Sequence, residues 1–158
     1  MLTKLIVLLV IVLLVFLGLR TYMPRFGSSV ATGIQESAGL QVLGDCSEKP
    51  NCQCSEALRT SQRVDRFPVT QDEADSAIAT IVSIINEQPG MQVVTQDDRY
   101  LHATHTSSLM RYVDDIEFLL SDDNLSLQVR SASRLGNSDL GANTERVRIL
   151  REAYTKKQ

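Results

Sequence analysis

Apolar residues are spread unevenly along the chain, and their longest run lies near the N-terminus. Leu5 through Leu19 contains no polar side chain, and Lys4 and Arg20 border it. A helix rises about 1.5 Å per residue, so crossing a bilayer core of ~30 Å takes about 20 residues. Residues 4–23 reach that length if the two cations extend to the interfaces. The pattern predicts one transmembrane helix within residues 1–25, with the bilayer as its partner.

A cleaved signal peptide is the alternative for this segment, because its apolar part also runs roughly 7–15 residues. Arg20 follows the apolar run directly, and no small-x-small cleavage site lies at the expected distance. Ser29-Val30-Ala31 has suitable residues but lies far downstream. A retained anchor is therefore favoured over a cleaved signal.

A change in composition divides the rest of the chain. Gly27 to Gly39 is rich in Gly, Ser, Ala and Thr and has no sustained apolar period. Such a segment is typical of a flexible tether, so we expect a flexible linker over residues 26–45. Residues 46–158 are then long enough for one domain.

Two helices are predicted in this domain. Thr70 and Glu73 form a capping box, and apolar residues at spacings of three and four follow, which predicts a helix over 71–88. Pro89-Gly90 ends it. Asn143 is a good N-cap for a second helix over 144–156.

Four strand-like runs lie between the helices: 91–95, 99–106, 112–120 and 125–133, with Asp97-Asp98 and Asp122-Asp123 as hairpin turns. Pairing Leu120 with Leu125 sets Phe118 opposite Leu127, and a slip by one residue would reverse the faces. The order α-β-β-β-β-α predicts an α+β fold, a four-stranded antiparallel sheet with flanking helices on one face.

Charge bears on the possible partners. Residues 46–158 carry 13 basic and 17 acidic residues, a net charge of −4. Nucleic-acid binding needs clustered Lys and Arg to neutralise phosphates. Nucleic acid is therefore not an expected partner.

The three cysteines are Cys46, Cys52 and Cys54. Pro50-Asn51 favours a turn that would let Cys46 and Cys52 form a disulfide, which requires an oxidising compartment. Cys54 is then free or pairs in place of Cys52. A zinc site with His102 or His105 is the alternative, but the cysteine spacing is not that of a zinc knuckle.

The expected register places polar residues on the second face of the sheet. These are Tyr100, His102, Asp115, Glu117 and Arg130, with Asp115 opposite Arg130 and Glu117 diagonal to it. The row is a candidate binding surface or acid/base site. Cross-strand ion pairs on a solvated or covered face are the simpler interpretation, and we favour it.

A second candidate is the loop that leads into the last helix. Arg130 and Arg134 precede it, and Ser138, Asp139 and Asn143 lie in it. A Gly-containing loop at a helix N-terminus can bind an anion, or the same side chains can simply cap the helix. No spacing marks a Ser-His-Asp arrangement.

Three stretches resemble domain-of-unknown-function family 1499, a bacterial and plastid family. They are Leu43-Gly-Asp-Cys46 with Pro50-Asn51-Cys52, Tyr100–Ala103 leading to Val113–Phe118, and Val129–Arg134 with the glycine-containing loop up to Asn143. The likeness covers about residues 39–153, and it departs after Cys52. The resemblance implies a preceding signal or membrane segment, and no established reaction, cofactor or catalytic residue.

Together these features predict a domain held at the bacterial inner membrane by a single-pass anchor and facing the periplasm. We expect a non-enzymatic module, without a cofactor, that binds a small ligand (a small anionic ligand is one candidate), a lipid or a membrane-protein partner. A hydrolase-type enzyme using the polar face and a structural subunit of a membrane complex are the alternatives.

Overall fold

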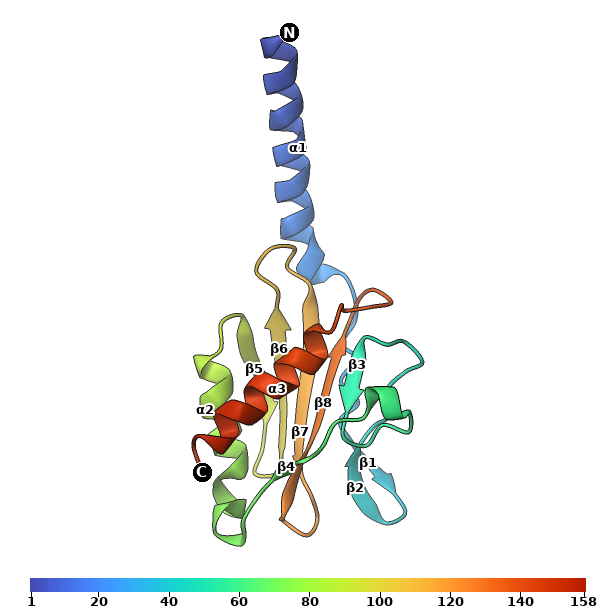
Figure 1. Ribbon diagram of the computed structural model, residues 1–158, viewed down its shortest axis with the longest axis vertical. Coiled ribbons are helices and arrows are strands. Elements are labelled where there is room, and N and C mark those ends of the chain that lie inside the picture. Colours follow the sequence, from blue (N-terminus) through green and yellow to red (C-terminus); the bar gives the residue numbers. More distant parts are fainter.

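The computed structural model describes all 158 residues and shows one long helix projecting from an α+β domain (Figure 1). Helix α1 (Leu2–Tyr22) continues into the short 3-10 helix η1 (Met23–Arg25). No α1 residue is buried against the domain. Residues Leu2–Arg25 are long and apolar enough to cross a membrane, as a signal sequence would also be, and the mean hydropathy of their most apolar 18-residue window is 3.0.

The domain is built on an antiparallel sheet of six strands. Its four long strands confirm the four predicted runs: β5 (Met91–Gln96), β6 (Tyr100–Thr106), β7 (Val113–Leu120) and β8 (Ser126–Ser133). Two further strands, β3 (Cys52–Cys54) and β4 (Phe67–Pro68), both pair with the outer edge of β8. The expectation of a four-stranded sheet was therefore wrong. These short strands satisfy backbone groups that β8 would otherwise expose at an edge.

The register of β7 against β8 differs from the prediction by two residues. Leu120 pairs with Leu127 rather than Leu125, and Phe118 pairs with Val129. The turn causes the shift, because the Ser121 amide bonds the Ser126 carbonyl and so extends the hairpin past Leu120. A shift of two keeps each side chain on its face. The predicted faces are therefore correct although the predicted partners are not.

Helices α2 (Ala77–Glu87) and α3 (Ala142–Thr155) lie on the same face of the sheet (Figure 1). The predicted capping box is present, although its first turns form a 3-10 helix, η3 (Gln71–Ser76). Helix α3 begins earlier than predicted, since Gly141 is its N-cap and Asn143 lies inside its first turn. Both helices pack on the sheet through one core, whose largest members are Ile81, Ile84, Ile85, Leu101, Ile116, Phe118, Leu127, Leu150, Phe67 and Tyr154.

The segment between α1 and the domain contacts the other face of the sheet. It contains a hairpin of β1 (Ile34–Ser37) and β2 (Leu40–Leu43), and the Leu43 amide donates to Gln128 Oε1 at 2.8 Å. The limits of the predicted linker and domain remain predictions. The structure adds that much of residues 26–45 lies against the sheet.

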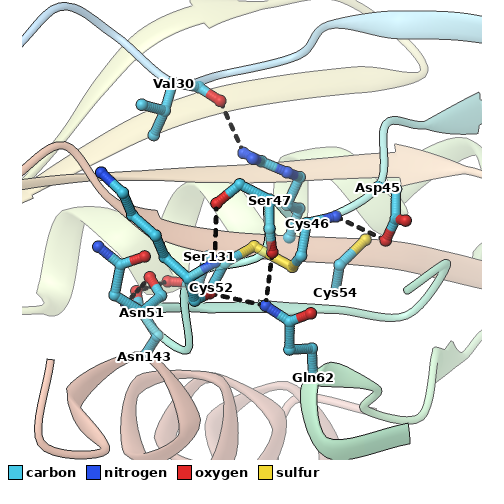
Figure 2. The surroundings of a disulfide bond; sticks show 12 residues. Val30, Asp45, Cys46, Ser47, Asn51, Cys52, Cys54, Gln62, Ser131 and Asn143 are labelled. Atoms are coloured by element: carbon cyan, nitrogen blue, oxygen red, sulfur yellow. Dashed lines mark hydrogen bonds between the residues drawn. A yellow bond between two sulfur atoms is a disulfide. The ribbon is translucent and has the colours of Figure 1, made fainter. Parts of the chain in front are cut away.

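The predicted disulfide joins Cys46 to Cys52 and ties the end of this segment to β3 (Figure 2). Gln62, which follows β3, donates through Nε2 to the Ser47 and Lys49 carbonyls inside the disulfide loop. Cys54 is free and fully buried, and burial raises the pKa of its thiol to about 11. The buried thiol is therefore protonated and a poor nucleophile.

We expect the disulfide to stabilise the domain against unfolding. Replacing Cys46 and Cys52 together with alanine should lower the free energy of unfolding by about 2–3 kcal/mol, because a short closed loop is lost from the unfolded chain. Urea denaturation of the variant and of the wild type measures the difference. Equal stabilities would show that the bond contributes nothing to the fold.

Candidate functional site

The predicted polar row lies on the face of the sheet opposite α2 and α3. Glu117 pairs with Arg130 across the strands, where the sequence had placed Asp115. Its Oε2 accepts from Arg130 Nη1 at 3.1 Å, and its Oε1 accepts from Tyr100 Oη at 2.9 Å. Asp115 lies opposite Ala132 instead. The expected pairing of Asp115 with Arg130 was wrong because of the two-residue shift.

Asp115 finds its partners elsewhere in the row. Arg134 donates to both of its carboxylate oxygens, at 2.9 and 2.8 Å, and His102 Nε2 lies 2.7 Å from Oδ1. The structure thus brings all five predicted residues of the row together and adds Arg134, which the sequence had placed with the helix loop.

Residues 29–33 cover both carboxylates of the row. The Ser29 hydroxyl and the Val30 amide donate to Asp115, and the Thr32 and Gly33 amides donate to Glu117 at 3.0 and 2.7 Å. Asp115 and Glu117 have no exposed surface. Every carboxylate oxygen is therefore engaged by the chain itself, and the row holds the segment that leads to α1.

The pKa shifts in the row favour the protonation states that hold residues 29–33. Burial by itself would raise the pKa of Asp115, but the Arg134 guanidinium, the Val30 amide and His102 lower it to about 2. Burial and the neighbouring Glu117 charge raise the pKa of Tyr100, which therefore remains a hydrogen-bond donor. Both groups hold the protonation state that their hydrogen bonds require at neutral pH.

Acid should release the covering segment. The pKa of Asp115 is depressed in the folded protein, so its contribution is full above an unfolded pKa near 4 and is lost as the pH falls towards 2. We expect hydrogen-exchange protection of the Val30 amide to decrease over that interval while the Phe118 amide in the core remains protected. Unchanged protection of Val30 at pH 2 would contradict this account of the contact.

The predicted loop site is occupied by its own side chains. Asp139 accepts from the Gly141 and Asn143 amides, so it occupies the helix N-terminus that an anion would use. Ser138 accepts from the Leu140 amide. Asn143 Nδ2 donates to the Asn51 carbonyl at 2.9 Å and links the disulfide loop to α3 (Figure 2). Arg130 and Arg134 do not bond these loop residues, because they donate to Glu117 and Asp115 on the other face of the sheet.

A third polar group, which the sequence analysis missed, lies between the sheet and α3. Arg146 Nη2 donates to Asp114 Oδ2 at 2.6 Å and to His105 Nδ1 at 3.1 Å, and Nη1 donates to the Ser131 hydroxyl at 3.0 Å. Arg146 and Asp114 are 6% and 7% exposed. This is a nearly buried ion pair with a histidine at its edge.

The hydrogen bond fixes the state of His105. Arginine only donates, so Nδ1 is the acceptor and the neutral ring carries its proton on Nε2. Burial, and then the nearby Arg146 charge, lower the pKa of His105, so the ring is neutral at pH 7. Nε2 makes no hydrogen bond and can donate to a ligand.

Beside this group is a cavity of about 510 Å³. Residues of the β6–β7 loop, residues of the β8–α3 loop and Met23 of η1 line it. The predicted residues Ser138 and Asp139 line it together with His105, Asp114, Ser133 and Arg146. The wall of the cavity includes two carboxylates, a guanidinium, an imidazole and hydroxyl groups.

The strand pattern carried a signal for these residues. His105 continues the alternation of Leu101 and Ala103, and Asp114 precedes Ile116 on the same face. Charged or ionisable side chains on a core-facing row require buried partners. Arg146 lies one helical turn before the buried Leu150, so it is on the face of the helix that packs on the sheet and can pair with Asp114.

A comparison with family models matches residues 42–154 to the family described as "Protein of unknown function (DUF1499)". The chain belongs to the DUF1499 family. The match spans the disulfide, all six strands of the main sheet and most of α3, and it leaves α1 outside. The resemblance seen in the sequence is thereby confirmed. Comparison with curated proteins and with solved structures gives no match.

Proposed function

We propose that this protein is a membrane-anchored domain of the bacterial envelope that binds a small polar ligand in the cavity beside Asp114, His105 and Arg146. It faces the periplasm, and the binding is non-enzymatic. The observation that carries the proposal is the cavity itself, which opens beside a polar group that the fold keeps almost entirely buried.

Two features support the location. Helix α1 is apolar on all sides and has no buried residue, which suits a lipid environment and not a protein core. The Cys46–Cys52 disulfide is expected to form and persist in an oxidising compartment such as the periplasm. Together, the single apolar helix and the disulfide support a location at the inner membrane.

The chemistry of the cavity supports binding over catalysis. Arg146 occupies Nδ1 of His105, and no serine hydroxyl is hydrogen-bonded to the ring. A nucleophile–base pair is therefore not assembled, whereas the hydroxyl of Ser133 in the cavity wall can orient a ligand. The carboxylates of the covered row, which a hydrolase would need, are engaged by residues 29–33.

Blocking the cavity tests the proposal. Ser138 is an exposed residue of the cavity wall, and a tryptophan there would fill the space without entering the core. Native mass spectrometry of the full chain, gently extracted from membranes, should show a small-molecule adduct that Ser138→Trp loses. Ser61→Trp, an exposed serine outside the cavity, is the matched control and should keep the adduct. A bare chain in all samples, or an adduct that Ser138→Trp retains, would refute ligand binding at this cavity.

A further inference from the structure

A second cavity also borders His105, and its wall includes two arginines and several hydrogen-bonding side chains. Its volume is about 520 Å³, and Arg20, Arg111, His105, Thr106, Ser107 and Ser108 line it. No carboxylate contributes to its wall. The cavity therefore favours an anion, unlike the first cavity, where Asp114 and Asp139 contribute negative charge.

The cavity is built at the junction of α1 and the domain. Arg20 lies in the last turn of α1, and its Nη1 donates to the Leu109 carbonyl of the β6–β7 loop at 3.2 Å. In a helix that spans the bilayer, a terminal arginine lies at the level of the lipid headgroups. The wall of the cavity is then at headgroup depth, a step that rests on the anchor of the proposed function.

Unused donors line this cavity. The Arg111 side chain is exposed and makes neither an ion pair nor a hydrogen bond. The Arg111 backbone adopts a left-handed φ of 62°. A left-handed conformation is uncommon for a residue with a side chain. Arginine presents forked donors that match phosphate oxygens, and Nε2 of His105 is a third donor on the same wall.

Exposed apolar residues surround the same end of the sheet. Leu109 in the β6–β7 loop is 65% exposed, and Leu140 in the β8–α3 loop is 98% exposed. Both loops leave the sheet at the end where α1 joins (Figure 1). Leucines beside arginines are typical of a surface that enters the interfacial region of a membrane. The combination fits a lipid whose acyl chains remain in the bilayer.

We propose that this second cavity binds the phosphate of an anionic phospholipid headgroup, with Arg111 and Arg20 as the cationic ligands and His105 as a neutral donor. The lipid then holds the domain upright against the bilayer and couples the membrane surface to the first cavity through the shared His105.

The test uses the full chain in nanodiscs of phosphatidylcholine, with and without phosphatidylglycerol. The chain has two histidines, so the ring resonances of His105 and His102 can be followed separately by NMR. Phosphatidylglycerol should shift the His105 resonance and leave that of His102, which lies in the covered row, unchanged. Arg111→Gln should weaken the response to phosphatidylglycerol about tenfold, as expected for one lost charge-assisted contact. Lys156→Gln, an exposed cation at the other end of α3, should respond as the wild type.

Three outcomes would overturn the assignment. They are a His105 resonance that is insensitive to phosphatidylglycerol, an Arg111→Gln variant that responds as the wild type, and a full shift produced by inorganic phosphate added to phosphatidylcholine discs. The last result would identify a site for free phosphate and not for a lipid. An unchanged His102 resonance in Arg111→Gln verifies that the variant is folded. Failure of the anchor is a separate result, because the chain would then not remain with the nanodisc.

Discussion

Replacing Arg130 with glutamine should lower the free energy of unfolding by about 3 kcal/mol, within the roughly 3–5 kcal/mol expected when a buried charge loses its partner. Arg130 donates to Glu117 and to the Val30 carbonyl, and Glu117 is fully buried. The expected value is at the lower end because Nε of Arg130 is itself buried without a partner. Removing that group relieves part of the cost.

Arg59→Gln is the matched control for this variant. Arg59 also bonds one carboxylate, that of Glu48, and one backbone carbonyl, that of Ser47, but its side chain is 48% exposed. A pair in solvent contributes about 1 kcal/mol or less. Urea denaturation of both variants compares the two environments. Equal losses would show that the row does not depend on its cover of residues 29–33.

Replacing Arg146 with glutamine should cost about 3–5 kcal/mol, because Asp114 then remains nearly buried without a cation. Arg148→Gln, two residues further along the same helix, removes a guanidinium that is 52% exposed and bonded to Glu145 and Glu152. That control should cost less than about 1 kcal/mol.

The same variant also reports on His105. Without Arg146, the ring loses both its hydrogen bond and a neighbouring positive charge, so its pKa should rise. An NMR titration of the His105 ring measures this change alongside the stability. A variant that is as stable as Arg148→Gln and has an unchanged His105 pKa would remove the basis for the ion pair described at the first cavity.

Side-chain alternation predicted the two faces of the sheet because burial acts on every second residue of β7 and β8. It could not fix the register, since a slip of two residues leaves the same apolar residues on the same face. The turn decided that point, through the Ser121 amide and the Ser126 carbonyl. Strands as short as Phe67–Pro68 show no alternation at all, so the sixth strand could be found only from the edge that it covers.

The covered row shows a second limit of sequence reasoning. Its residues were identified, but their partners include backbone amides of Val30 and Gly33, which carry no signal in a sequence rich in small residues. The group around Arg146 was missed for the opposite reason. Asp114 stands next to Asp115, and only the strand alternation separates the residue that faces α3 from the one that faces residues 29–33.

The intact mass of the chain in carbonate-washed membranes tests the anchoring most directly. A protein held by α1 should remain in the washed membranes, begin at Met1 or Leu2, and contain one disulfide between Cys46 and Cys52, with Cys54 open to alkylation after unfolding. A mass that corresponds to a chain starting beyond residue 25 would show that α1 is a cleaved signal, and three free thiols would place the domain outside an oxidising compartment. Either result would contradict a domain anchored at the periplasmic face of the membrane.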